Sequence, residues 1–124
     1  MGNPHAVVFI KYINNLKIES IGPQFELYHL FQERTNVEFV EKLDDERLKL
    51  RTWERGSGET LSCGSGACAA VAAGIISGQL SKNVPIKIIQ KGGTLEVEYK
   101  EDEGIILTGP AEKVYEGKIL LKKK

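Results

Sequence analysis

The sequence predicts an α+β domain in which a strongly curved, mainly antiparallel sheet wraps around one central apolar helix. Two observations carry this prediction. Residues 67–73 are alanine, cysteine and valine only, so a helix formed by them has no polar face and must be enclosed. The rest of the chain contains about seven or eight short segments with the alternation and turn signals of strands.

Before the apolar helix, we expect mainly strands. They cover residues 5–11, 35–42 and 47–55, and a shorter strand runs through Ile18 after a turn at Asn14-Asn15. The exception is residues 24–31, where the apolar spacing predicts one or two helical turns that begin after Gly22-Pro23.

A glycine-rich loop over residues 56–66 leads into the apolar helix, which we expect to run for about 14 residues and to end near Gly78. Strands are expected again after the helix. They cover residues 84–90, 94–100, 105–108 and 114–121, with turns at 92–93, 102–104 and 109–110 between them.

Length and composition indicate one domain of an ordinary globular protein. The chain has 124 residues, 41% of them hydrophobic and 27% charged, and its formal net charge is zero. Neither a basic surface for nucleic acid nor a membrane-spanning run of 18 or more apolar residues is present, and no signal peptide is recognised, so we expect a cytoplasmic protein that binds neither nucleic acid nor membrane. The two cysteines, Cys63 and Cys68, form neither a disulfide framework nor a metal-ligand pattern, and we expect reduced thiols and no metal site.

Cys63 stands where the glycine-rich loop meets the helix. We expect the amides of Gly64, Ser65 and Gly66 to be unpaired and to point outward, because the first turn of a helix offers them no acceptor. Such a helix end favours negative charge, either a thiolate or a bound carboxylate or phosphate. Cys68 lies about 140° around the helix from Cys63 and is expected to be a packing residue.

Two ionisable residues end otherwise apolar strand faces. Glu54 follows Leu48, Leu50 and Thr52 on one face of the strand over residues 47–55, so its carboxylate points inward near the strand's end and should be solvated or paired. His5 shares a face with Val7 and Phe9 in the same way. A single such residue is more often structural than catalytic, but the adjacent glycine-rich loop favours a functional interpretation of Glu54.

Several segments resemble motifs of the C-terminal half of the diaminopimelate epimerases. They are GNPH at residues 2–5, ERTNVEF at 33–39, TWERG at 52–56, GET at 58–60, CGSGACA at 63–69, TGPAE at 108–112 and YEG at 115–117. The resemblance covers nearly the whole chain in order, and it implies a single diaminopimelate-epimerase-like domain over residues 1–124. Proline racemases and phenazine-pathway isomerases share the general fold, but ERTNVEF and WERGSGET together are not expected in them.

The resemblance implies a cofactor-independent enzyme that interconverts LL- and meso-2,6-diaminopimelate. In that chemistry one cysteine acts as thiolate base and another as thiol acid on opposite sides of the α-carbon. The resemblance makes Cys63 one of the two cysteines, with Glu54 and His5 as the catalytic residues that modulate the pair. It assigns substrate binding to Asn3, Asn36, Glu54, Arg55, Gly64 and Ser65.

The resemblance also implies a partner. In the family the second cysteine lies in a CGNGxR-like motif of the N-terminal half, and this chain contains no such motif. The polar start Asn3-Pro4-His5 is therefore interpreted as a break at the domain junction, and the isolated chain is predicted to be inactive without an N-terminal epimerase domain. A homodimer that presents two copies of Cys63 is a further hypothesis.

Three other interpretations remain open. The first is a non-catalytic module that binds a carboxylate or an amino acid at the helix end. The second is another member of the proline racemase-like isomerase group. The third is a thiol-redox or cysteine-nucleophile protein, although the chain has no CxxC motif and, besides His5, only His29, which lies in an apolar segment.

Overall fold

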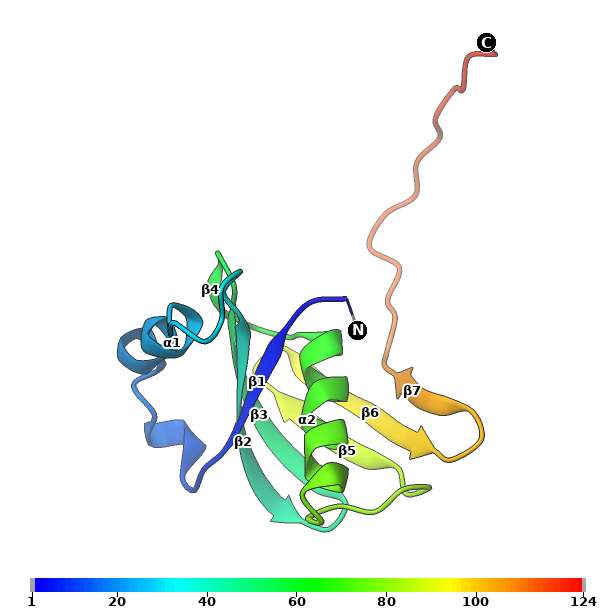
Figure 1. Cartoon of the computed structure of the whole chain (residues 1–124). Helices are drawn as coiled ribbons and strands as arrows, with labels where there is room; N and C mark the ends of the chain where they lie inside the picture. The colour runs from blue at the N-terminus through cyan, green and yellow to red at the C-terminus, as the bar shows by residue number, and fades with distance from the viewer. Residues whose placement is uncertain (1, 124) are drawn as a thin grey trace.

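The computed structural model describes residues 2–123 and contains one curved mixed sheet with helix α2 (Gly64–Ile76) on its concave side (Figure 1). The sheet order is β1-β2-β3-β5-β6-β7. The short strand β4 lies off this path and pairs with β3 alone. The strands are β1 (His5–Phe9), β2 (Asn36–Asp44), β3 (Arg47–Glu54), β4 (Gly58–Thr60), β5 (Ile86–Gln90), β6 (Gly93–Lys100) and β7 (Gly104–Thr108). The predicted α+β architecture is confirmed.

Strand pairing explains where α2 begins. The pairs β1/β2 and β3/β5 are parallel, and the other four are antiparallel. The last residues of β3 pair with β4, where Glu54 lies opposite Gly58, whereas its first residues pair with β5. The chain therefore leaves the end of β3 through β4, crosses the sheet as α2 and returns as β5, which places the start of α2 near the end of β3.

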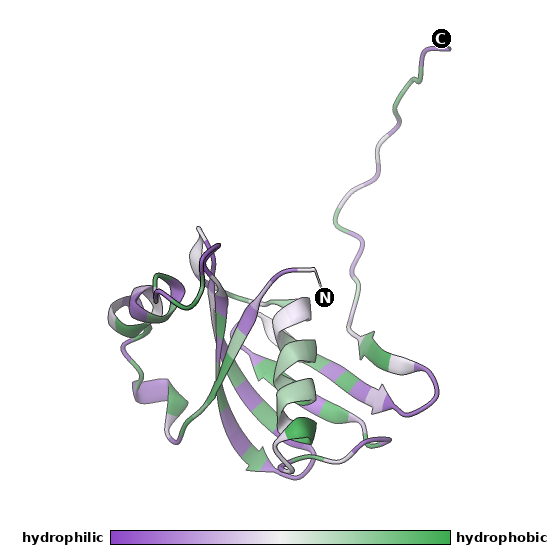
Figure 2. Cartoon of the chain, in the orientation of Figure 1, coloured by the Kyte–Doolittle hydropathy of each residue, from purple (hydrophilic) through white to green (hydrophobic). Residues whose placement is uncertain are grey.

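Helix α2 is enclosed as its composition predicts. Ala67, Ala70 and Val71 are fully buried. They pack in one apolar cluster with strand residues that include Val40, Leu48, Leu50, Ile86, Ile88 and Val97. Figure 2 shows this apolar helix against the sheet. The predicted helix begins and ends within about two residues of the observed one, because an all-apolar stretch of this length can be stabilised only in the interior.

A second apolar layer, which the sequence did not predict, covers the convex face of the sheet. The 3-10 helix η1 (Ile13–Asn15) and helix α1 (Ile18–Glu26) pack there with Val37, Phe39 and Trp53. At Gly22 an added Cβ would lie 2.4 Å from the Trp53 ring, so only glycine allows this close packing. The sheet is thus buried on both faces at β2.

The prediction of a short strand through Ile18 followed by a helix over residues 24–31 was wrong. Helix α1 begins at Ile18, contains Pro23 and ends at Glu26. Gly22-Pro23 was interpreted as the beginning of the helical segment, whereas Pro23 lies inside α1, where its ring removes a backbone donor. The apolar contacts of Ile18, Ile21 and Phe25, at helical spacing, hold the helix despite this loss.

The predicted strand over residues 114–121 was also wrong. Regular secondary structure ends with β7 at Thr108, and residues 109–123 extend away from the sheet (Figure 1). Val114, Tyr115, Ile119, Leu120 and Leu121 are each more than 80% exposed, at 82–97%. An apolar pattern forms a strand only beside another strand, and this segment has no such neighbour within residues 2–123.

The long glycine-rich loop contains one element that was not predicted, the three-residue strand β4. In the described part of the chain, no helix combines the length and the apolarity needed to cross a membrane.

Candidate active site

Cys63 caps the N-terminus of α2. Its backbone is extended (φ −145°, ψ 109°), and its Sγ accepts a hydrogen bond from the backbone N–H of Gly66 at 3.3 Å. The Ser65 hydroxyl lies 3.5 Å from the same sulfur. The Cys63 N–H donates to Gln90 Oε1 at 2.8 Å, which ties the cap to the end of β5. The predicted position of Cys63 is confirmed.

The expectation that three amides point outward was wrong for Gly66, whose N–H is bound to the Cys63 sulfur. The amides of Gly64 and Ser65 also belong to the first turn, and the helix backbone offers them no acceptor. Gly64 and Ser65 are both partly exposed. A negatively charged group can therefore approach two amides and the Ser65 hydroxyl at this end of the helix.

Opposing effects act on the Cys63 thiol. Burial raises its pKa most, the hydrogen bonds from Ser65 and Gly66 lower it, and the nearby Glu54 carboxylate raises it. The helix end thus contributes the predicted stabilisation of a thiolate, but desolvation outweighs it. The net effect is a pKa above the ordinary value, which favours the protonated thiol.

Glu54 lies at the end of β3, on the face that points toward α2. Its Oε1 accepts a hydrogen bond from Thr60 Oγ1 of β4 at 3.0 Å, and the side chain is partly buried. The predicted inward, paired position is confirmed. The Glu54 charge also raises the pKa of Cys63, so the carboxylate acts on the thiol.

His5 lies at the start of β1 and pairs with a carboxylate that was not predicted as a site residue, Glu38 of β2. His5 Nδ1 is 2.9 Å from Glu38 Oε1, and the two side chains are only 5% and 0% exposed. An added Cβ at Gly66 would lie 2.6 Å from Glu38 Oε1 and 3.1 Å from Cys63 Sγ, so the glycine leaves room for both beneath the first turn. Glu38 could have been found from the sequence, since strand alternation places it on the same face as Asn36.

Burial raises the pKa of Glu38, the hydrogen bond and charge of His5 act in the opposite direction, and the Glu54 charge raises it further. Glu38, His5, Glu54 and Cys63 thus surround the start of α2 from three strands and one helix cap.

The predicted substrate-binding asparagines lie at the same end of the sheet. Asn36 Oδ1 accepts the backbone N–H of Arg55 at 2.7 Å, and the Asn36 N–H donates to the Pro4 carbonyl at 3.1 Å. This second bond places the bend that contains Asn3 beside the start of β2. Arg55 Nη1 donates to the Glu33 carbonyl at 3.0 Å. The structure brings these residues together, and their contact with a substrate stays a prediction.

A second buried carboxylate, Glu26 of α1, lies on the convex side of the sheet near the end of β3. It accepts a 2.8 Å hydrogen bond from Trp53 Nε1, and it lies 3.4 Å from the Gly56 N–H and from Arg34 Nη1. Sequence reasoning missed Glu26, because only the path of α1 brings it to the turn after β3.

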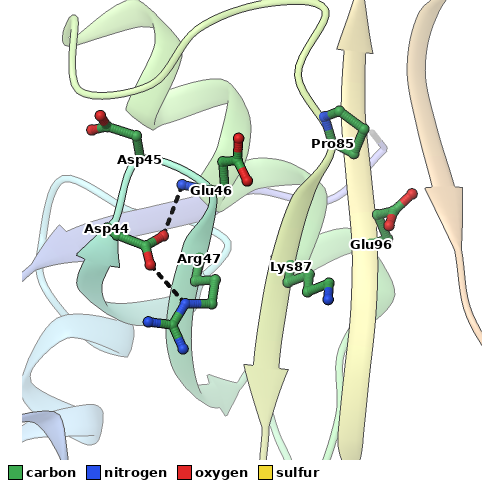
Figure 3. A pocket seen from close by; sticks show the side chains of 7 residues that line it. All are labelled: Asp44, Asp45, Glu46, Arg47, Pro85, Lys87 and Glu96. Atoms are coloured by element: carbon green, nitrogen blue, oxygen red, sulfur yellow. Dashed lines mark hydrogen bonds and ion pairs between the residues drawn. The ribbon is translucent and has the colours of Figure 1, made fainter.

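Two hollows on the surface lie away from these residues. The first, of about 510 Å³, is lined by Asp44, Asp45, Glu46, Arg47, Pro85, Lys87 and Glu96, at the start of β3 rather than its end (Figure 3). Asp44 is already bound there to Arg47 and to the Glu46 N–H. The second, of about 570 Å³, lies between Tyr12, Lys42 and Gln79. Within residues 2–123, no group of three or more His, Cys, Asp or Glu side chains is arranged to hold a metal ion.

Comparison with known proteins identifies close sequence relatives. A family profile described as diaminopimelate epimerase matches residues 1–114. A diaminopimelate epimerase of Methanococcus maripaludis strain C5 is 48% identical over 120 residues, which is 96% of this chain and 43% of the relative. A diaminopimelate epimerase of Acetivibrio thermocellus is 46% identical, again over 96% of this chain and 42% of the relative. The chain spans less than half the length of these curated relatives.

Solved structures show the same fold at lower identity. A PhzF-family phenazine biosynthesis protein of Bacillus anthracis matches with a TM-score of 0.60 at 21% identity, over 86% of this chain and 34% of that protein. A putative phenazine biosynthesis PhzC/PhzF protein of Clostridium difficile matches with a TM-score of 0.57 at 24% identity, over 81% and 35%.

Proposed function

The chain belongs to the diaminopimelate epimerase family, and we propose that it supplies one acid/base cysteine and one wall of an active site that interconverts LL- and meso-2,6-diaminopimelate. One observation carries the proposal. Cys63 caps an enclosed helix, with two amides available beside it and with Glu54 and the His5–Glu38 pair around it. This is an arrangement for moving a proton beside a bound carboxylate.

In the proposed reaction, the thiol of Cys63 delivers a proton to one side of the α-carbon, and in the reverse direction its thiolate removes that proton. No electron-withdrawing cofactor is required if the charge of the carbanion is stabilised electrostatically. The amides of Gly64 and Ser65 are suited to hold the α-carboxylate, where that charge accumulates. Glu54 beside Cys63 disfavours the thiolate and can accept the substrate ammonium.

Substrate contacts are proposed for the polar residues at the same end of the sheet. Asn3, Asn36 and Arg55 lie around the turn after β3, and Asn36 is held by the Arg55 N–H. We propose that they hydrogen-bond the distal amino-acid end of diaminopimelate, which carries a second ammonium and a second carboxylate.

The second acid/base must come from outside this domain. Cys68 is only 8% exposed and packs in the apolar cluster around α2, so it cannot reach a substrate at the helix end. We propose an N-terminal epimerase domain as the partner, because the chain covers 43% of the Methanococcus relative. The exposed apolar side chains of residues 114–121 supply a surface that such a partner would cover. A homodimer that presents two Cys63 thiols is the alternative source.

A cytoplasmic location, in a pathway to lysine and cell-wall precursors, is part of the proposal. An acid/base cysteine must stay reduced, and Cys63 and Cys68 are both free thiols here.

The test is exchange of the α-proton of diaminopimelate with deuterium from solvent. We expect no exchange with the chain alone, and exchange with LL-to-meso conversion when the chain is combined with the part of the Methanococcus relative that it does not match. Cys63→Ala should reduce this activity by about 10²- to 10⁴-fold, the usual share of one acid/base group. Cys68→Ala is the matched control and should retain it.

Other results would favour other functions. Robust turnover by the chain alone would refute the need for a partner, and activity that rises with dimer concentration would support the homodimer. The free amides at the helix end also fit a non-catalytic amino-acid-binding module. That module would bind diaminopimelate in the Cys63→Ser variant and show no exchange under any condition.

A further inference from the structure

Buried polar atoms without partners gather around the first turn of α2. Among residues 2–123, four buried side-chain atoms have no hydrogen-bond partner: His5 Nε2, Glu38 Oε2, Thr52 Oγ1 and Gln90 Nε2. Buried polar atoms are nearly always paired in folded proteins. Their residues are adjacent, since Glu38 binds His5 and pairs with Thr52 across the strands, and Gln90 binds the Cys63 N–H. Such a group of unpaired buried polar atoms calls for an explanation other than packing, such as a functional role.

Glu38 lies at the centre of this region. Its side chain has no solvent exposure, its Oε1 contacts the His5 ring, and the same oxygen would lie 2.6 Å from a Cβ added at Gly66 of the first turn. A buried carboxyl lowers the stability of a fold unless it is paired, and Glu38 has one partner for two oxygens. Glu38 thus binds His5 and lies next to Gly66, whose N–H donates to the Cys63 sulfur.

We propose that Glu38 is a positioning residue of this active site, which holds the His5 imidazole through Nδ1 and shares one proton with it beneath the first turn of α2. The inference rests on the proposed function, because His5 acts there only as part of that site. Since Nδ1 is occupied by Glu38, Nε2 is the ring nitrogen left for chemistry.

The number of protons on the pair decides what Nε2 can do. When Glu38 is ionised, it accepts a hydrogen bond from Nδ1–H. A neutral ring then presents a bare Nε2 that can accept a hydrogen bond. One further proton on the pair, held on Glu38 or on Nδ1, leaves Nε2 carrying a hydrogen that it can donate. Glu38 thus holds the orientation of His5, and the protonation of the pair decides whether Nε2 donates or accepts.

The charges around the pair favour keeping one proton on it. The ionisable groups that face it from the neighbouring elements are Glu54 of β3 and Cys63 at the start of α2. Burial and the Glu54 charge raise the pKa of Glu38, against the effect of His5. When Cys63 becomes a thiolate, the negative charge increases further, and a proton retained by the His5–Glu38 pair offsets it.

The wild-type chain itself provides the first test. NMR titration of the His5 ring and of the Glu38 side-chain carboxyl carbon should show both signals changing with common midpoints, as expected for two groups that share a proton. The exposed His29 can be replaced by Gln to leave one imidazole signal. A Glu38 carboxyl that titrates alone at an ordinary glutamate pH would overturn the proposal.

The second test is Glu38→Gln, which keeps the size and a hydrogen-bonding group but removes the charge. We expect the His5 ring signals to follow a different pH curve from wild type, because the partner carboxyl is no longer coupled to them. The pH profile of Cys63 alkylation by iodoacetamide, measured in a Cys68→Ala background, should lose the inflection that coincides with the pair. A merely structural carboxyl would leave the alkylation profile of Cys63 unchanged.

Glu41→Gln is the matched control. Glu41 is also a carboxylate of β2 and accepts the Ile13 N–H at 2.7 Å, but it lies on the opposite face of the strand. It should leave both curves unchanged, whereas wild-type curves in Glu38→Gln would refute the proposal. Neither measurement depends on turnover, so failure of the diaminopimelate exchange assay would be distinguishable from failure of the His5–Glu38 inference.

Discussion

Helix α2 and residues 114–121 are both rich in apolar side chains, yet the chain encloses only one of them. Ala67, Ala70 and Val71 of the helix are fully buried, whereas Ile119 and Leu120 are 82% and 97% exposed. The helix satisfies its own backbone hydrogen bonds and needs only a surface to pack on, and the sheet supplies one. An extended segment needs a neighbouring strand as well. Apolar composition therefore indicates that burial would stabilise a segment. Whether the segment is buried depends on a helix, sheet or strand that it can pack against.

The largest expected effect concerns the enclosed region. Leu50→Ala removes a side chain that is 2% exposed in the cluster around α2, and the free energy of unfolding should fall by about 2–5 kcal/mol. Urea denaturation followed by circular dichroism measures the loss. An effect below about 1 kcal/mol would show that the helix is less tightly enclosed than the structure indicates.

Gly66→Ala tests the close packing at the start of the same helix. The new methyl group would overlap Glu38 Oε1 and crowd the Cys63 sulfur, so stability should fall by about 1–3 kcal/mol despite the better helix propensity of alanine. Gly2→Ala is the control, because an added Cβ there meets nothing within 4 Å. An equal thermal shift for both variants would contradict the packing argument.

The pH dependence of stability should differ in the same way between an ion pair of the sheet and one in residues 109–123. The Arg51 guanidinium, assisted by Lys91, holds the pKa of the nearly buried Glu59 below its usual value. Since the folded pKa lies below the unfolded one, this contribution is fully present above the unfolded pKa and is lost as the pH falls through the folded pKa. Glu59→Gln should lower stability by about 1 kcal/mol at pH 7, and the difference from wild type should shrink toward pH 3.

Glu116 provides the contrast. It forms a 2.7 Å ion pair with Lys113, but the two side chains are 78% and 68% exposed. Glu116→Gln should therefore leave the denaturation curve unchanged at every pH, because an exposed pair of this kind contributes little. A pH-dependent loss of stability in this variant would place the segment 109–123 against the folded body.

The smallest expected effect on stability is that of the exposed apolar residues. Replacing Ile119, Leu120 and Leu121 together by Ser should change the free energy of unfolding by no more than about 0.5 kcal/mol, because these side chains are 82–97% exposed. The same variant should weaken activation by the complementary part of the Methanococcus relative in the exchange assay. Unchanged activation would show that the partner does not use this segment.

Much of the site could be predicted because local patterns determine it. The glycine-rich loop before an apolar stretch predicted the position of Cys63, and strand alternation predicted the inward direction of Glu54. His5 was identified without its partner. Glu38 is 33 residues away in the sequence, and only the parallel pairing of β1 with β2 brings the two together.

The sequence by itself determined that one helix must be enclosed, that a curved sheet encloses it, and that a thiol stands at its N-terminus. These properties follow from composition and spacing within short segments. Only the tertiary structure decided the second layer on the convex face, the buried His5–Glu38 pair and the exposure of residues 109–123. Each of these depends on which residues distant in the sequence come into contact. The free energy of such contacts can outweigh a local preference, and without such contacts a local preference has no effect.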